Sequence, residues 1–217
     1  MIILDIETSG IDTGRCGIWQ IASIDLDNPK NYFLEEGRID DEDIVAEGAL
    51  KVTGKTEKYL RNTKKQPQKQ LVSNYLEWRK SCKEKINIGQ NVGWDFNFIQ
   101  NKCIKYGIMD KMCEVMGQRA IELHTLAQEK YREINGEYMK DEKGKSSMNL
   151  TKILKFCGIP DERMNLESNM DVTKKGTVHN ALEDCKLAGE CYYRLEYGKN
   201  LFKEFKKFSI PDYLNRE

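Results

Sequence analysis

The stretch Ile2-Ile3-Leu4-Asp5-Ile6-Glu7-Thr8 decides the fold of this chain. Its apolar residues are typical of a strand that is buried on both faces of a sheet. Asp5 and Glu7 stand two residues apart, so on a strand both carboxylates point to the same face. Two like charges in a buried position are costly unless a cation lies between them, and carboxylates are ligands that Mg²⁺ and Mn²⁺ prefer. The stretch therefore indicates a metal site. The alternative is that both acids lie at the exposed end of an edge strand.

The patterns that follow predict an α/β domain. Residues 18–26 and 31–34 read as strands joined to the first by short turns, which indicates an antiparallel meander. In the second half, short strand-like pieces alternate with helical patterns, and this alternation favours parallel neighbours. The strand-like pieces cover 86–91 and 120–123, and helices are predicted over 41–50, 66–83, 95–106, 124–133, 148–157 and 179–197.

Two segments near the end of the chain are assigned separately. Residues 161–177 read as a loop, and residues 201–208 read as a short amphipathic helix. No linker composition separates a second domain. We expect one domain over residues 1–200, with residues 201–217 as a helical tail packed on it.

Composition narrows the class of protein. The chain carries 35 basic and 35 acidic residues, so its formal net charge is zero and any phosphate-binding surface must be local. No apolar run approaches the length of about 18 residues that a membrane span needs, and no secretory signal pattern is present. The seven cysteines are odd in number and include no C-x-x-C. That pattern favours reduced thiols in a cytoplasmic protein over disulfides or a zinc site.

Two further acids and one histidine are candidate site residues. Asp95 follows a predicted strand and opens a helix, at the sheet edge where α/β proteins build sites, although an ordinary helix-capping aspartate is the alternative. His179 and Asp184 would stand about 140° apart on one straight helix. They converge only if His179 lies on the loop just before the helix. A lone histidine is more often a surface or hydrogen-bonded core residue, and we assign His124 to that class.

Taken together, these residues resemble the DEDD 3′→5′ exonucleases of the DnaQ-like type, in their histidine subclass. The three motifs of that family are matched in order by Asp5-x-Glu7-Thr8, by Asn91-x-x-x-Asp95 and by His179-x-x-x-x-Asp184. The tyrosine subclass would carry a tyrosine where this chain has Asn180. Two positions depart from the family: Gln20 replaces a common glutamate, and His124 replaces a common acid before Thr125.

The resemblance implies a ribonuclease H-like fold, with a mixed five-stranded sheet flanked by helices. It implies a metal-dependent 3′→5′ exonuclease that removes nucleotides from single-stranded 3′ ends, with DNA favoured over RNA. Two divalent ions, Mg²⁺ or Mn²⁺, would be held by Asp5, Glu7, Asp95 and Asp184, with Asp5 bridging both. His179 would act as the general base, since an imidazole titrates near neutral pH.

Candidate substrate-binding residues surround these motifs. They are Thr8, Ser9 and Gly10 with their backbone amides, Asn91, the rings of Trp94 and Phe96, and the pair Lys174 and Lys175. Aromatic rings stack on bases of single strands, and lysines bind phosphates. For the lysine pair, a solvated loop is the alternative.

Three other functions stay open from the sequence. An RNA-trimming enzyme of the oligoribonuclease or ribonuclease T kind would differ mainly in contacts to the 2′-hydroxyl. A non-catalytic accessory protein could bind nucleic acid or a polymerase, but inactive relatives usually lack one of the five motif residues. A metal-binding protein unrelated to nucleic acid would not require His179 near four acids.

Overall fold

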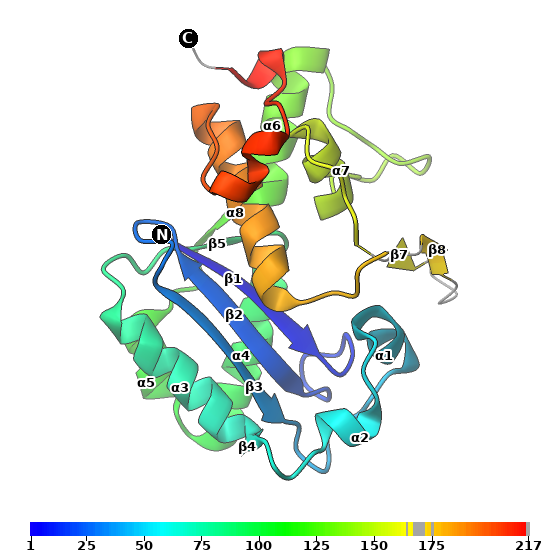
Figure 1. Ribbon diagram of the computed structural model, residues 1–217. Helices are drawn as coiled ribbons and strands as arrows, with labels where there is room; N and C mark the ends of the chain where they lie inside the picture. Colours follow the sequence, from blue (N-terminus) through cyan, green and yellow to red (C-terminus); the bar gives the residue numbers. More distant parts are fainter. Residues whose placement is uncertain (164, 167–171, 175, 216–217) are drawn as a thin grey trace.

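A mixed β-sheet forms the centre of the computed structural model, which describes residues 1–163, 165–166, 172–174 and 176–215 (Figure 1). Its strand order is β4-β3-β2-β1-β5-β6. The strands are β1 (Ile2–Thr8), β2 (Ile18–Asp25), β3 (Tyr32–Arg38), β4 (Gln66–Pro67), β5 (Asn87–Gly89) and β6 (Ala120–Glu122). β1, β2 and β3 pair antiparallel, whereas β5 runs parallel to both β1 and β6. The predicted order of a meander followed by parallel strands is therefore confirmed.

The sheet has six strands in the described residues, so the predicted number of five is wrong. The additional strand, β4, has only two residues and pairs in parallel with Gly37 and Arg38 of β3. A two-residue strand that contains a proline shows no alternating pattern. It forms here because the chain passes the edge of β3 before it enters a helix, and sequence periodicity does not reveal such a passage.

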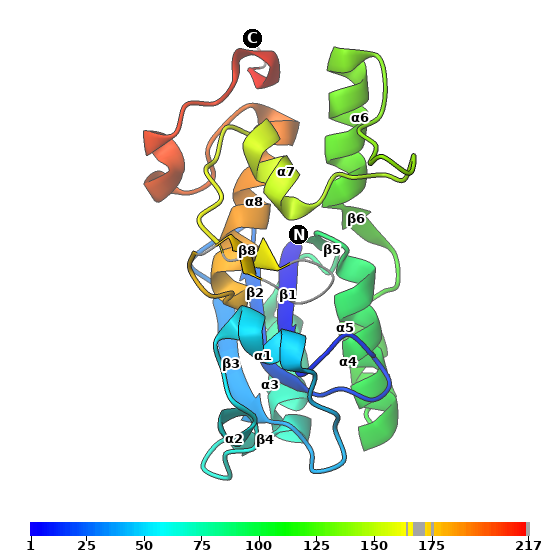
Figure 2. The same cartoon turned by 90° about the vertical axis from the view of Figure 1, so that its right-hand side faces the viewer.

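Helices cover both faces of the sheet (Figures 1 and 2). They are α1 (Glu47–Thr53), α2 (Glu57–Leu60), α3 (Gln68–Ser81), α4 (Val92–Tyr106), α5 (Met109–Val115), α6 (Leu123–Asn135), α7 (Leu150–Phe156) and α8 (Ala181–Tyr197). Buried residues of α6, α7 and α8 form one apolar cluster with the sheet, and those of α3, α4 and α5 form another. No helix in the described part of the chain is long and apolar enough to cross a membrane.

The central strand β1 contributes to both clusters. Ile3 packs with α6, α7 and α8, while Leu4 and Ile6 pack with α3, α4 and α5. This alternation explains the nearly continuous apolar pattern of β1, because both of its faces are covered. Asp5 and Glu7 share the face of Ile3, as the strand period of two requires. Both acids are therefore directed to the side of the sheet on which α8 lies.

Three predicted segments differ from the structure. The helix expected over 41–50 begins later, as α1, and the loop expected over 161–177 contains a two-stranded hairpin of β7 (Asn165–Leu166) and β8 (Val172–Lys174). The tail segment 201–208 forms a short 3₁₀ helix, Lys203–Lys207, rather than an amphipathic α-helix.

The segment after α8 is tied to that helix by a buried ion pair. Arg194 and Glu190 are both fully buried and lie 3.0 Å apart. Arg194 also donates hydrogen bonds to the carbonyl oxygens of Phe205 and Phe208, and Glu190 accepts from the backbone N–H of Leu201. The pair thus satisfies backbone groups of the tail that would otherwise be buried without partners.

Replacing Arg194 by alanine is expected to lower the free energy of unfolding by about 3–5 kcal/mol, because it leaves the charge of Glu190 buried and unpaired. Arg132→Ala is the matched control, since Arg132 forms an exposed pair with Glu129 and such surface pairs contribute little to stability. Urea denaturation followed by circular dichroism measures both changes. Equal effects of the two substitutions would contradict the role given to Arg194.

Candidate active site

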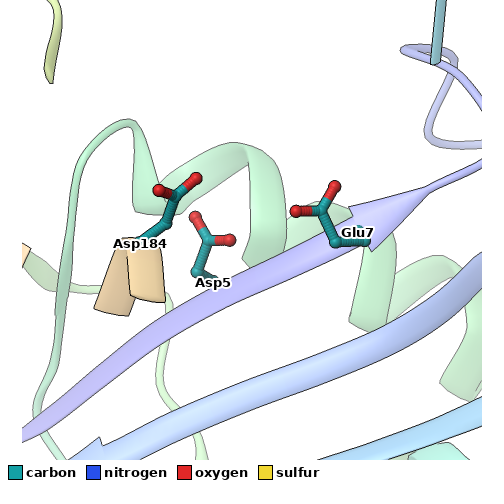
Figure 3. Close-up of side chains that lie close together, drawn as sticks. All are labelled: Asp5, Glu7 and Asp184. Carbon is teal, nitrogen blue, oxygen red and sulfur yellow. The ribbon is translucent and has the colours of Figure 1, made fainter. Parts of the chain in front are cut away.

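Three carboxylates converge where β1 meets the start of α8. Asp5 and Glu7 come from β1 and Asp184 from the first turn of α8, and one oxygen atom from each lies within 4.8 Å of the others (Figure 3). Only 8% of Glu7 and 7% of Asp184 is exposed. The Asn180 side chain accepts hydrogen bonds from the N–H groups of Leu182 and Glu183, so it caps α8 and determines where the first turn lies.

Gln20, one of the two positions noted above as departing from the resemblance, holds α8 against the sheet. It faces Glu7 across the β1–β2 ladder and is 3% exposed. Its side-chain oxygen accepts the N–H of Ala181 at 3.0 Å, and its amide nitrogen donates to Glu36 at 3.2 Å. A buried amide in an apolar strand is the signal by which sequence reasoning could have found this role. Gln20 thus positions the helix that carries Asp184.

Asp95 lies beside the cluster without being one of its three members. Its carboxylate accepts the N–H of Ile6 at 3.1 Å. Within the described residues, β5 pairs with β1 only at Ile2 and Ile3, so the edge of β1 on the β5 side has no strand partner beyond them. Asp95 supplies the missing acceptor from the first turn of α4 and is only 4% exposed.

α4 begins three residues earlier than predicted because of contacts that are distant in sequence. Asn91 has a left-handed backbone conformation, with φ of 57°, which ends β5 abruptly. The Glu122 carboxylate of β6 then accepts the N–H groups of Asn91 and Val92 at 2.7 and 3.2 Å. This cap from a neighbouring strand starts α4 at Val92 and places Asp95 in the first turn.

His179 lies on the loop just before α8, where convergence with Asp184 requires it. Its backbone N–H donates to the Val52 carbonyl of α1 at 3.2 Å. Its Nδ1 atom is 3.4 Å from Oδ2 of Asp184. The imidazole therefore stands next to the carboxylate cluster.

A cation that the sequence did not indicate also reaches the cluster. Nη1 of Arg163 lies 3.2 Å from Oδ1 of Asp184, and the same guanidinium pairs with Asp161. Arg163 lies in the segment 161–177, which was predicted to be a loop. Its approach to Asp184 depends on how that segment crosses the start of α8, and no local pattern encodes this crossing.

The acids perturb one another strongly. Burial and the neighbouring charge of Asp184 raise the pKa of Glu7 from 4.5 to about 7, although Arg163 opposes the change. Burial, Asp184, Asp95 and Glu7 raise the pKa of Asp5 well above its ordinary value. Burial likewise raises the pKa of Asp95 despite its hydrogen bond from Ile6. Crowded, buried carboxylates of this kind favour either protons or a bound cation.

The donor set fits a divalent metal ion. All three converging groups are carboxylates, which are hard oxygen ligands preferred by Mg²⁺ and Mn²⁺. The raised pKa values of Asp5 and Glu7 reflect lost hydration first and then repulsion among the acids, and a bound dication would offset both costs.

The thermal stability of the metal-free protein is expected to fall between about pH 5 and pH 8. The folded pKa of Glu7 is raised, so the folded state binds this proton more tightly than the unfolded state, and stability is lost as the pH rises toward about 7. Melting temperatures measured in EDTA over this pH range check the expectation. In the Glu7→Gln variant, the melting temperature should fall less steeply with pH. Saturating Mn²⁺ should reverse the trend, because metal ligands must be deprotonated. A melting temperature in EDTA that rises over this range would contradict the burial of crowded acids.

A cavity of 350 Å³ opens beside Glu7. It is lined mainly by apolar groups, from α1 on one side and from Thr8, Gly10, Ile11 and Trp94 on the other. The Trp94 indole donates to the Ile11 carbonyl at 3.3 Å and packs edge-on against Phe98. A cavity with such a lining suits a flat, partly apolar group.

The predictions that Phe96 and Ser9 bind substrate are wrong, because both residues are buried. Phe96 belongs to the buried cluster under the sheet, so its ring cannot stack on a base. Ser9 is fully buried; its N–H donates to the Gly17 carbonyl, and its hydroxyl donates to Ile44 and accepts from the Gly17 N–H. Ser9 therefore shapes the loop and has no group left for a substrate.

The remaining candidates lie on different elements of the fold. Asn91 is exposed at the start of α4, and Lys174 ends the strand β8. Lys175 lies outside the described residues. The Thr8 hydroxyl donates to the Gly10 carbonyl at 2.7 Å and thereby stiffens the cavity wall.

Comparisons with known proteins identify the fold. No model of a known protein family matches the sequence, and no curated protein matches it either. Among solved structures, the chain is similar to cell-death related nuclease 4 (CRN-4), with a TM-score of 0.62 and 14% identity over 89% of this chain and 62% of that one. It is also similar to E. coli exonuclease I in complex with a dT13 oligonucleotide, with a TM-score of 0.63 and 18% identity over 87% of this chain and 39% of that one.

A third similar structure is a 3′-exonuclease described in 3′-end specific recognition of histone mRNA stem-loop. Its TM-score is 0.59, with 14% identity over 89% of this chain and 62% of that one. The chain spans less than two thirds of each of these three proteins. At such identities the likeness shows the fold, and it confirms the predicted ribonuclease H-like α/β class.

Proposed function

We propose that this chain is a metal-dependent 3′→5′ exonuclease that removes nucleotides from single-stranded 3′ ends by two-metal-ion phosphodiester hydrolysis, with DNA favoured over RNA. The observation that carries the proposal is the convergence of Asp5, Glu7 and Asp184, with oxygen atoms within 4.8 Å of one another. Nucleases of the same fold, exonuclease I and CRN-4, support it.

In this proposal Asp5, Glu7 and Asp184 hold divalent ions, with Asp95 at their side. Bound Mg²⁺ or Mn²⁺ supplies a Lewis acid and lowers the pKa of water. His179 acts as the general base and takes the proton of the attacking water at Nε2, because Nδ1 is directed to Asp184. Asp184 thereby orients the imidazole, as a carboxylate commonly does for a catalytic histidine.

The cavity beside Glu7 is the proposed site for the 3′-terminal nucleoside. Trp94 and Ile11 offer apolar surface to the base, and Thr8 and Gly10 border the same space. Asn91 and Lys174 are proposed to contact the strand farther from its end. Because the net charge is zero, affinity for phosphates must come from such local groups.

A second candidate is an RNA-trimming exonuclease. It is favoured by the likeness to the 3′-exonuclease described with histone mRNA. The two candidates differ in how the terminal sugar is accommodated, since only RNA carries a 2′-hydroxyl. A non-catalytic accessory protein, including a partner of a polymerase, is less consistent with the retention of four acids and His179.

One experiment separates these functions. The purified protein is incubated with Mg²⁺ and matched single-stranded DNA and RNA of the same sequence, each labelled at the 5′ end. We expect ladders that shorten one nucleotide at a time from the 3′ end, faster for DNA, and slower cleavage when the strand ends in a 3′-phosphate. Faster digestion of RNA would favour the second candidate. Cleavage of a circular strand, or no cleavage at all, would contradict an exonuclease.

A further inference from the structure

The guanidinium of Arg163 is fixed on one side by Asp161. Nε lies 3.0 Å from one carboxylate oxygen and Nη2 lies 3.2 Å from the other. Asp161 also accepts the backbone N–H of Arg163 at 3.0 Å and the hydroxyl of Thr151 at 2.6 Å. Although burial opposes the change, these hydrogen bonds lower the pKa of Asp161 to about 2. Asp161 is therefore ionised. The Thr151 hydroxyl of α7 and the backbone N–H of Arg163 hold its carboxylate in place.

The backbone around Arg163 is also held in place, by contacts with Thr177. The N–H of Thr177 donates to the Glu162 carbonyl at 2.8 Å, and Arg163 and Thr177 form an isolated parallel bridge. A Cβ atom at Gly176 would come within 2.4 Å of the Glu162 oxygen, so this crossing requires glycine. The crossing lies two residues before His179 and directs Arg163 toward the start of α8.

The other side of the guanidinium contacts the carboxylate cluster. Nη1 is 3.2 Å from Oδ1 of Asp184, whose Oδ2 is 3.4 Å from Nδ1 of His179. The Arg163 side chain is only 12% exposed. It also acts on the other two acids, since its charge opposes the rise in the pKa of Asp5 and Glu7. One oxygen of a proposed metal ligand is thus already paired with a cation that Asp161 holds in position.

We propose that Arg163 is a positioning residue that serves as the built-in counter-ion of Asp184: it aligns this carboxylate in the metal-free protein and, by competing for Oδ1, weakens metal binding. This inference rests on the proposed metal site. A fixed positive charge beside the cluster repels an incoming dication, while it relieves repulsion among the acids when no ion is bound.

The test is Mn²⁺ binding by calorimetry, combined with melting temperatures in EDTA and in saturating Mn²⁺. The proteins are the wild type, Arg163→Gln, Arg163→Lys and the surface control Arg132→Gln. Arg163→Gln should bind Mn²⁺ about tenfold more tightly or better, given the strength of charge pairs near a protein surface. It should melt lower than the wild type in EDTA, and Mn²⁺ should narrow that difference. Arg163→Lys keeps the charge and should bind Mn²⁺ nearly as the wild type does, and Arg132→Gln should not change the affinity for Mn²⁺.

Three results would overturn the inference. If Arg163→Gln binds Mn²⁺ as the wild type does and loses equal stability with and without the ion, Arg163 only supports the fold. If it binds Mn²⁺ more weakly, Arg163 assists the metal instead of competing with it. Absence of Mn²⁺ binding to the wild type would refute the metal site itself, and the inference with it, so the two failures are distinguishable.

Discussion

Asp5→Asn is expected to reduce strand cleavage by roughly 10³-fold or more, because bound metal ions supply several kcal/mol of transition-state stabilisation. Asp5 lies at the centre of the sheet, between Glu7 and Asp184, and its carboxylate is one of the three that converge. The substitution is nearly isosteric and removes one of several crowded charges. The metal-free variant should therefore fold, and it should melt no lower than the wild type.

The measurement is single-turnover digestion of a 5′-labelled single strand in Mg²⁺, with circular dichroism as the test of folding. Asp110→Asn is the matched control, since Asp110 is an exposed acid at the start of α5, away from the cluster. Undiminished metal-dependent cleavage by a folded Asp5→Asn protein would refute the assignment of the cluster as the active site.

His179→Ala is expected to lower kcat by roughly 10²–10⁴-fold, the range for a positioned general base. KM should change far less, because the proposed nucleoside cavity and the carboxylates remain. Mn²⁺ binding should also survive, which separates loss of the base from loss of the metal site.

His124→Ala is the control for the second substitution, because His124 is the other histidine of the chain. Its ring nitrogens are already engaged, Nδ1 with the Met148 carbonyl and Nε2 with the Ser146 hydroxyl. The variant should keep its kcat, as expected of a hydrogen-bonded structural histidine. A His179→Ala protein with near-full kcat would show that His179 is not the general base.

The fold could be predicted well where local pattern and burial agree. The apolar run of β1 required two covered faces, and the structure supplies them through Ile3 on one side and Leu4 and Ile6 on the other. For His179, helix geometry gave a condition: it converges with Asp184 only from the loop before the helix. The helix predicted over 179–197 in fact begins at Ala181, and His179 lies on that loop. Such inferences succeed because the period of a strand or helix is fixed by its backbone.

Features that depend on contacts between distant segments could not be predicted in the same way. α4 starts at Val92 because Glu122, on a neighbouring strand, accepts its first N–H groups. Arg163 reaches Asp184 because Asp161 and the crossing at Thr177 direct it there. Phe96 was expected in the site because it follows Asp95, but the rotation of α4 directs its ring into the core. In each case the residues that are adjacent in sequence do not indicate which distant residue makes the contact.

The central claim is that Asp5, Glu7 and Asp184 form a divalent metal centre, and anomalous diffraction from crystals soaked in Mn²⁺ tests it most directly. We predict an anomalous peak about 2.0–2.3 Å from carboxylate oxygens of these residues, the range of metal–oxygen bonds for such ions. A second peak on the side of Asp95 is expected when a nucleoside monophosphate is also bound. Crystals soaked in saturating Mn²⁺ that show no anomalous peak at the three carboxylates, or that show peaks only elsewhere on the protein, would contradict the account.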